Sequence, residues 1–372
     1  MTDPAKSSAE AFGSTHTRSF PPLLQQLKSS LLVSTFQTRM LIAMRSDGEA
    51  LHTDFVALKR PMGVAADSKR IVVGGRDRIY EFRNMPTLTA GPASLEAPRG
   101  CDAVYLMRNV HITGGIDVHE MALVGDECWF VNTRFSCLCT LDHTHSFIPR
   151  WRPPFITSYA PEDRCHLNGL AMQGGRPKFV TALGQSDAHR GWRANKRDGG
   201  ILIDVDSGET IAHGLSMPHS PRLYRDRLWM LESGKGDLAT VDVATGKLET
   251  VIRLPGFTRG LDFFGPLAFV GLSQVRASNT FVDIPLTDEN PDRASGIWVV
   301  NIETAKTVAF LRFSGRVEEI FAVQLLRGVT HPQICAEDDP ELECTWVLPD
   351  AAMSEVKLTS PKAAVEATQE IR

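Results

Sequence analysis

Three histidines stand near the start of short β-type runs that are far apart in the sequence. They are His119, His166 and His219, separated by 47 and 53 residues. Three imidazoles that meet around a common axis form a ligand set for zinc, iron or manganese, with one position left for water or substrate. Alternatively, each ring forms hydrogen bonds with channel water or backbone carbonyls. The residue types alone leave both interpretations open.

Arg259 and Glu319 stand at the start of two later runs. The planar guanidinium of Arg259 suits a carboxylate or phosphate, so we predict that it binds an anionic part of the substrate. Glu319 is predicted to act as a general base or an oxygen ligand. A structural ion pair between these two side chains is the alternative interpretation.

Further side chains are predicted to bind substrate from loops around the same point. An insertion at residues 183–200 carries basic and aromatic residues that suit an anionic substrate, although such a run is also typical of a solvated loop. Arg222 ranks below Arg259, because its position three residues after His219 favours the opposite strand face. The predicted substrate-binding residues are Tyr159, Asn168, His189, Arg190, Trp192, Arg193 and Arg222.

The elements that must position these residues are repeated pairs of strands. When Trp129, Lys178, Trp229 and Phe269 are aligned, the residue ten positions earlier is His119, Asn168, His219 and Arg259, respectively. Third and fourth strands follow in most units, as in residues 236–254 and 296–313, joined by Thr-Gly or Thr-Ala turns. Repeats of 40 to 60 residues with four strands each indicate a β-propeller. The predicted blades begin at Pro61, His119, Asn168, His219, Arg259 and Glu319.

The two ends of the chain complement each other. Residues 317–326 resemble a first strand with no blade after it, whereas strands near residues 31–57 lack a first strand. Joined, they complete a sixth blade and leave no exposed sheet edge at the closure. We therefore predict an all-β, six-bladed propeller whose last blade contains strands from both termini. A β-sandwich or two unrelated β domains are the alternatives.

The predicted domain organisation is a disordered N-terminal tail over residues 1–19, the propeller over residues 20–349 and a polar C-terminal tail over residues 350–372. One helix is expected at residues 21–32, after two prolines.

The composition restricts the classes of partner. With 40 basic and 44 acidic residues the net charge is -4, which gives no overall field for a nucleic acid. No apolar run approaches the roughly 20 residues that a membrane-spanning helix needs, and no apolar signal core is present. Seven scattered cysteines indicate reduced thiols in a cytoplasm rather than a disulfide scaffold. Cys137 and Cys139 fit strand packing better than a metal site.

Residues 168–171 (NGLA) and 61–65 (PMGVA) resemble the first-strand motif of the six-bladed superfamily of gluconolactonases, regucalcin and strictosidine synthase. That resemblance implies a calcium ligand at Asn168. The surrounding residues are histidines rather than carboxylates, so a divalent transition metal is expected ahead of calcium. The channel zinc site of the six-bladed lyase that cleaves peptidyl-hydroxyglycine is a chemical analogue.

Over most of its length the chain resembles an uncharacterised bacterial family of conserved hypothetical proteins. The similarity is clearest at residues 166–171 (HLNGLA), 217–222 (MPHSPR) and 256–263 (GFTRGLDF).

The sequence favours a metal-dependent lyase, isomerase or hydrolase that acts on a small anionic or peptide-like substrate. His119, His166 and His219 are the predicted metal ligands. The alternatives are a non-catalytic propeller that binds a protein or glycan, and a calcium-dependent hydrolase similar to the lactonases. The oligomeric state is left open.

Overall fold

The computed structural model describes residues 12–86, 88, 100–275, 283–289, 293–353 and 355. The chain divides into one unit at Met1–Ala336 and a second at Glu337–Arg372. The first unit contains the strands, and the second contains α5 (Glu341–Cys344) and α6 (Asp350–Met353). The predicted propeller boundary at residue 349 therefore falls 13 residues beyond the end of the first unit. Residues 1–11 and 356–372 of the predicted tails lie outside the described residues.

Six sheets form the first unit, and each contains a run of four antiparallel strands. Blade 1 has β5 (Val64–Ala66), β6 (Arg70–Gly74), β7 (Arg78–Asn84) and β8 (Ala103–Ile112). Blade 2 has β9 (Val118–Val124), β10 (Glu127–Asn132), β11 (Cys137–Thr140) and β12 (Ile148–Trp151). Blade 3 has β13 (Leu167–Gln173), β14 (Arg176–Ala182), β15 (Gly200–Asp204) and β16 (Thr210–Leu215).

The other three blades follow the same order. Blade 4 has β17 (Pro218–Tyr224), β18 (Arg227–Glu232), β19 (Asp237–Val241) and β20 (Leu248–Arg253). Blade 5 has β21 (Phe257–Phe264), β22 (Leu267–Ser273), β23 (Gly296–Asn301) and β24 (Lys306–Phe313). Blade 6 has β25 (Ala322–Arg327), β2 (Ser29–Thr35), β3 (Met40–Ser46) and β4 (Leu51–Ala57).

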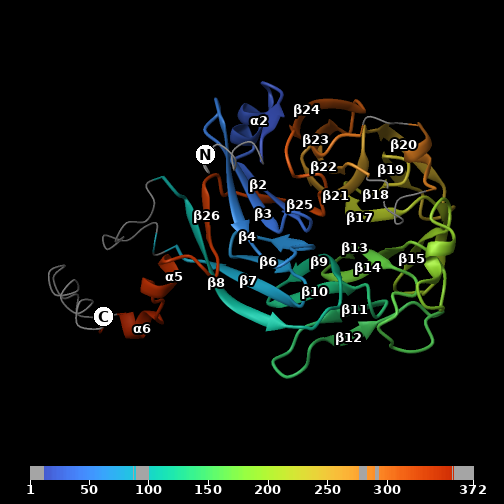
Figure 1. Cartoon of the computed structure of the whole chain (residues 1–372), viewed down its shortest axis with the longest axis horizontal. Helices are drawn as coiled ribbons and strands as arrows, with labels where there is room; N and C mark the ends of the chain where they lie inside the picture. The colour runs from blue at the N-terminus through green and yellow to red at the C-terminus, as the bar shows by residue number, and fades with distance from the viewer. Residues whose placement is uncertain are drawn as a thin grey trace, which may run out of the picture. The chain divides into compact units, whose positions relative to one another are not determined.

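The first strands of the blades form a closed ring. β5, β9, β13, β17, β21 and β25 contact one another in that order, and β25 contacts β5. Figure 1 shows the sheets placed around this centre. The predicted six-bladed β-propeller is confirmed.

Blade 6 joins the two ends of the chain, as predicted. β25 pairs antiparallel with β2, from Ser29 opposite Arg327 to Ser34 opposite Ala322. Six residue pairs between segments far apart in the sequence close the ring. Their pairing satisfies backbone groups that would otherwise lie on an open strand edge.

The same turn chemistry recurs between the third and fourth strands of blades 2 to 6. In each, the side-chain oxygen of an Asp or Asn accepts backbone N–H bonds from residues two and three positions later. Such a side chain replaces a backbone partner in a tight turn, which explains why these positions are Asp or Asn. They are Asp47, Asp142, Asp204, Asp242 and Asn301.

The structure adds two edge strands that the sequence analysis does not predict. β1 (Ser14–His16) lies in the predicted N-terminal tail and pairs with β24 at the outer edge of blade 5. β26 (Pro332–Cys335) pairs parallel with β8 at the outer edge of blade 1. The predicted helix at residues 21–32 is wrong in length: α2 (Phe20–Gln26) ends where the fully buried β2 must begin.

The core lies between neighbouring blades. One cluster combines Phe20 and Leu24 of α2 with buried residues of blades 5 and 6, and four further clusters contain residues of adjacent blade pairs. None of the helices in the described part of the chain has the length and apolar character that a bilayer-spanning helix needs.

Candidate functional site

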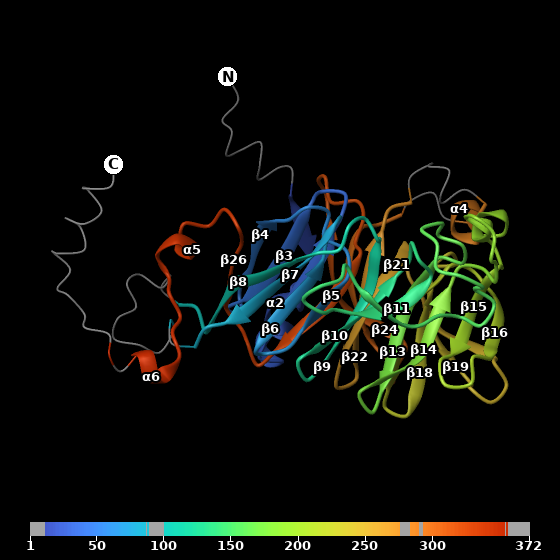
Figure 2. The same cartoon turned by 90° about the horizontal axis from the view of Figure 1, so that it is seen from below.

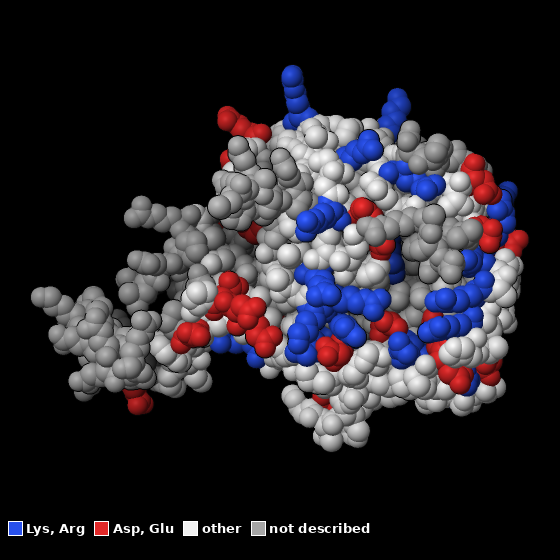
Figure 3. Space-filling view, viewed as in Figure 1, with Lys and Arg blue, Asp and Glu red and all other residues white. Residues whose placement is uncertain are grey.

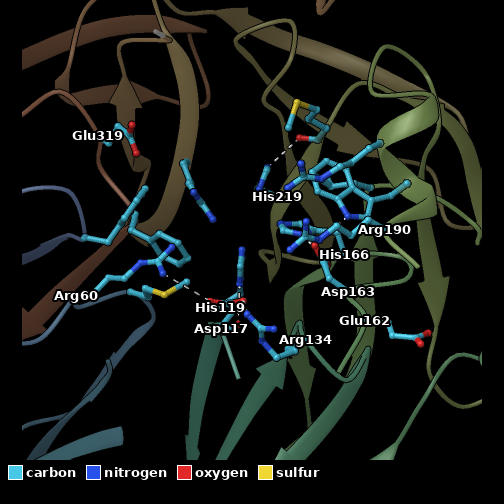
Figure 4. Close-up of a pocket in the computed structure, with 18 of the residues that line it drawn as sticks. Arg60, Asp117, His119, Arg134, Glu162, Asp163, His166, Arg190, His219 and Glu319 are labelled. Carbon is cyan, nitrogen blue, oxygen red and sulfur yellow. Dashed lines mark hydrogen bonds and ion pairs between the residues drawn. The ribbon is translucent and has the colours of Figure 1, made fainter. Parts of the chain in front are cut away.

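A cavity of about 390 Å³ lies where the inner strands of the blades begin. Nine of the twelve predicted site residues line it: His119, His166, His189, Arg190, Trp192, Arg193, His219, Arg259 and Glu319. Figure 4 shows the imidazoles of His119, His166 and His219 entering it from different elements. The ring centroids of His119 and His166 are 4.9 Å apart.

His119 and His219 occupy equivalent places on the inner strands of blades 2 and 4. The ring Nδ1 of His119 lies 3.0 Å from the carbonyl oxygen of Asp117, and that of His219 lies 2.9 Å from the carbonyl oxygen of Met217. Each acceptor is two residues earlier in the chain. The same local geometry is therefore built twice, from different flanking residues.

A left-handed backbone residue makes this geometry possible. Asp117 has φ 52° and Met217 has φ 47°, a conformation that costs a non-glycine residue about 1 kcal/mol or more. The turn folds each carbonyl back toward the imidazole that follows it. His166, two residues before Asn168, has the same backbone conformation in blade 3, with φ 51°.

A hydroxyl group from the residue directly after the second strand of the blade also contacts each imidazole. Thr133 Oγ1 is 2.7 Å from Nδ1 of His119, and Ser233 Oγ is 3.0 Å from Nδ1 of His219. Both hydroxyls stand fourteen residues after the histidine they contact. Thr133 donates its own hydrogen to the carbonyl of Leu167, at 2.6 Å, and is left to accept from the ring.

These contacts fix the tautomer of both rings. A carbonyl oxygen only accepts hydrogen bonds, so Nδ1 of His119 and of His219 carries the proton and Nε2 keeps its lone pair. Burial, followed by the effect of nearby His166 and Arg259, lowers the pKa of His119 well below its ordinary value. Burial and Arg259 lower the pKa of His219 in the same way. Both rings are therefore neutral near pH 7.

His166 is held by a carboxylate instead. Its Nδ1 lies 2.8 Å from Oδ1 of Asp163, and Oδ2 of the same carboxylate accepts a 3.0 Å bond from the indole of Trp192. The rings of His166 and Trp192 are 4.5 Å apart. Asp163 thus connects a site imidazole to the loop that follows β14.

Arg259 brings a cation into the cavity. Its guanidinium carbon lies 3.6 Å from the ring centroid of Phe321, a stacked position that leaves the N–H groups along the edge. No hydrogen bond or ion pair joins this guanidinium to any residue that the structure describes. Burial lowers its pKa to about 10, against the opposing effect of Glu319 and Glu120, so the group stays charged near neutral pH.

Bulges in the inner strands lie beside His219 and Arg259 and help to direct these side chains toward the cavity. The pairing of β17 with β18 shifts between His219 and Arg222, and that of β21 with β22 shifts between Thr258 and Leu261. An extra residue in one strand redirects the side chains beside it. At the second bulge only glycine fits, because a Cβ on Gly260 (φ 80°) would lie 2.6 Å from the backbone nitrogen of Val323.

Three predicted substrate-binding residues do not line this cavity. The amide of Asn168 donates to the carbonyl of Pro218 and accepts from Thr181, so it joins blades 3 and 4. Arg222 pairs with Glu120 at 2.6 Å. Tyr159 is exposed on the surface beneath Arg152, 4.5 Å from ring centroid to guanidinium.

Five charged residues that were not predicted also line the cavity: Arg60, Asp117, Arg134, Glu162 and Asp163. Asp117 lies 3.3 Å from Arg134 and 3.9 Å from Arg60, and Asp163 holds His166 as described. The repeat contains a signal for Asp117, because Asp117 lies two residues before His119 just as Met217 lies two residues before His219. Arg60 lies in the connection from blade 6 to blade 1 and Arg134 in the turn between β10 and β11, and the repeat gives no such signal for either.

The predicted metal site is not preformed. Among the described residues, no group of three or more His, Cys, Asp or Glu side chains is arranged so that it could hold a metal ion. The donors themselves suit a metal, because a ligating imidazole needs one nitrogen fixed by an acceptor and the other unprotonated. Cys137 and Cys139 lie buried in β11 with their sulfurs 3.4 Å apart, packed in the core of blade 2.

The loop after β14 lies at the rim of the cavity. It contains η1 (Gly191–Ala194), and Trp192 packs into an apolar cluster with Met217, Phe257 and Ile284. Figure 2 shows α4 (Pro285–Glu289) on the same side of the propeller. Figure 3 views this side, where Lys and Arg side chains gather around a hollow. The segment between β22 and β23 includes residues 276–282 and 290–292, which lie outside the described residues.

Comparison with known proteins supports the fold and identifies a family. Among curated proteins, none matches this chain in sequence. A chain from a crystal structure of a nidogen/laminin complex is similar in fold, with a TM-score of 0.51 at 10% identity over 81% of this chain and 99% of that one. A protein of unknown function from Bacteroides caccae has a TM-score of 0.46 at 10% identity, over 80% of this chain and 99% of that one. The family described as "Domain of unknown function (DUF4915)" matches residues 18–335, and the chain therefore belongs to that family.

Proposed function

We propose that this protein is an enzyme that acts on a small anionic substrate bound in the cavity at the start of the inner strands. One observation carries the proposal: the cation of Arg259, without a bonding partner among the described residues, shares the cavity with two neutral imidazoles of fixed tautomer. The pairing of an anion receptor with proton acceptors is the arrangement that acid–base chemistry on a carboxylate or phosphate ester requires.

Arg259 is the proposed anion receptor. Removing a cation from water is costly unless an opposite charge compensates for it, and the negative charges of Glu319 and Glu120 only partly offset the effect of burial on the pKa of Arg259. A bound carboxylate or phosphate would supply both the charge and the missing hydrogen-bond acceptors. Stacking on Phe321 holds the guanidinium plane in place before the ligand arrives.

His119 and His219 are the proposed bases. Their Nε2 lone pairs are available because Nδ1 is occupied, and their lowered pKa keeps them unprotonated at neutral pH. A neutral imidazole beside an anchored anion would take a proton from the substrate or from water, a first step shared by lyases, isomerases and hydrolases. Glu319, at the same cavity, is the proposed second proton carrier.

Titration calorimetry of the full chain with glutarate and with inorganic phosphate tests the anion site. We expect binding by the native protein and a loss of at least tenfold in affinity for Arg259→Ala. Arg225→Ala is the matched control, because Arg225 forms an exposed ion pair with Glu303 away from the cavity. Equal affinities for the two variants would refute the role of Arg259.

A divalent transition metal held by His119, His166 and His219 is the second candidate. Fixation of every Nδ1 by an oxygen favours it, whereas the described arrangement would have to tighten before the three rings could share an ion. Elemental analysis of the native protein and of the variant with all three histidines changed to alanine decides between the two. About one equivalent of zinc, iron or manganese, lost in the variant, would support the metal enzyme.

Calcium is disfavoured as the resident ion. Both ends of the Asn168 amide already bond within the protein, so this side chain would have to leave Pro218 and Thr181 to bind an ion. The remaining alternative is a propeller that binds a protein or glycan without catalysis. This alternative would be favoured if the protein binds an anion in the cavity but does not convert it chemically, and if no proton transfer depends on His119 or His219.

A further inference from the structure

Three of the four carboxylates that line the cavity, those of Asp117, Glu162 and Asp163, are engaged by neighbouring side chains. Asp117 lies beside Arg134 and Arg60, and Glu162 pairs with Arg164 at 2.7 Å. Asp163 is engaged by His166 and Trp192. The partners of these three carboxylates are therefore residues other than Arg190 and Arg193.

Two further cations at the rim lack such compensation. Arg190 and Arg193 line the cavity from the loop after β14, and neither side chain has a carboxylate partner among the residues that the structure describes. The guanidinium carbon of Arg193 lies over the ring of Trp192, 5.2 Å from its centroid. Both are exposed, in contrast to the deeper Arg259.

The loop that carries these cations is fixed in place. The backbone N–H of Arg190 donates to the backbone carbonyl of Glu162 at 3.1 Å. The backbone N–H of Trp192 donates to the backbone carbonyl of Arg164 at 3.3 Å. Arg197 at the end of the loop pairs with Asp288 of α4 at 2.9 Å. Asp187 bonds to Arg164 and to Thr157, at 2.7 and 2.6 Å. A loop with this many anchors presents its cations at a set place rather than as a solvated run.

We infer that the substrate carries two anionic groups, one bound by Arg259 inside the cavity and the other by Arg190 and Arg193 at its rim. This inference rests on the proposed function and names its substrate class: a dicarboxylate, or a carboxylate with a phosphate or phosphonate at the other end. The apolar side chains of Met217, Phe257 and Phe321 also line the cavity, which suits a substrate with a short hydrocarbon spacer.

The two ends should differ in their response to salt. Rim cations are exposed to solvent, so added salt screens their attraction for an anion. The cation of Arg259 is shielded by protein on several sides and is screened less. Salt dependence therefore provides a readout that a purely structural role of the loop would not produce.

The test measures the affinity of the full chain for α,ω-dicarboxylates from succinate to suberate, and for monocarboxylates of the same chain length. A parallel series with one terminal phosphonate distinguishes the two kinds of anion. At one chain length we expect a diacid to bind at least tenfold more tightly than its monoacid. The double variant Arg190→Ala, Arg193→Ala should lose most of that difference while leaving monoacid affinity within about twofold of the native value.

The outcomes separate this inference from the function on which it rests. If monoacids and diacids bind equally, or if the rim variant weakens both equally, the two-anion inference is wrong, although Arg259 remains an anion receptor. If neither series binds, the proposed function fails as well. Arg176→Ala, at an exposed position on β14 outside the cavity lining, is the control for a general loss of positive charge.

Discussion

Arg222 and Arg259 lie on neighbouring inner strands, and they differ in the groups that surround their guanidinium cations. Arg222 has a carboxylate, Glu120, at 2.6 Å and donates to the carbonyls of Leu170 and Pro221. Arg259 has an aromatic ring beneath it and no bonding partner among the described residues. Arg222 lines a separate hollow with Asp262 and Gln324, whereas Arg259 lines the cavity with the imidazoles.

We propose that the difference separates a structural cation, Arg222, from a binding cation, Arg259. Glu120 comes from blade 2 and Arg222 from blade 4, so their ion pair reaches across blade 3 and joins three blades. Its charge is used inside the fold. Under the same proposal, the charge of Arg259 serves a ligand from outside the protein.

The largest effect is expected at Arg259. Replacing it with alanine removes the proposed receptor for the anion, and loss of one member of a shielded charge pair costs about 2–5 kcal/mol in binding. We expect a loss of roughly 100-fold in glutarate affinity, measured by calorimetry, with the melting temperature near that of the native protein. A large loss of stability with unchanged affinity would reverse the assignment of the two arginines.

Arg222→Ala should show the opposite pattern. Removing this cation leaves the carboxylate of Glu120 without its partner in a mostly buried place, which costs about 3 kcal/mol of unfolding free energy. Denaturant titration measures the loss, and the double variant Glu120→Gln, Arg222→Gln should recover much of it. Stability that is unaffected by the single change would show that the ion pair does not hold the inner strands together.

His119 and His219 should make stability depend on pH. Their pKa is lowered in the folded protein, whereas an unfolded histidine titrates near about 6.5. Below that pH the unfolded chain binds protons that the folded protein does not, so the unfolding free energy falls as the pH falls. The limiting slope is about 1.4 kcal/mol per pH unit for each ring.

Denaturant titrations between pH 5 and pH 7.5 measure this slope. The variant His119→Gln, His219→Gln should show a shallower dependence, whatever its stability at pH 7. His213→Gln serves as the control because this side chain is exposed on β16. An unchanged slope in the double variant would show that the two rings titrate normally.

The smallest effect concerns the hydroxyls that hold the imidazoles. Thr133→Val and Ser233→Ala each remove one hydrogen-bond partner while the carbonyl acceptor stays, so the expected cost is about 1 kcal/mol. The ¹⁵N chemical shifts of the native rings should show a protonated Nδ1 and an unprotonated Nε2. Rings protonated at Nε2 would contradict the proposed role as bases.

The repeat explains why the fold could be predicted from the sequence. Aligned Trp, Lys and Phe positions fixed the order of the strands, and unmatched strands at the two ends indicated the closure in blade 6. β1 and β26 have three and four residues, too few for a periodic pattern. Their pairing depends on the blade edges they cover, which only the assembled propeller provides.

Individual side-chain directions were harder to predict. Alternation along a strand predicts which face a residue takes, but the bulges in β13, β17 and β21 change that alternation beside Asn168, His219 and Arg259. Asn168 shares the aligned position of His119 and His219 yet bonds to the next blade. Asp163 precedes β13, so strand alternation did not predict that it bonds to both His166 and Trp192, which lies 29 residues away.

A crystal structure of the full chain grown with selenate tests the central claim most directly, because anomalous scattering locates the anion. We predict a selenium peak in the cavity with selenate oxygens at hydrogen-bond distance from the guanidinium of Arg259. A structure in which selenate binds elsewhere while the cavity holds none, or in which Arg259 has turned onto Glu319, would contradict the account.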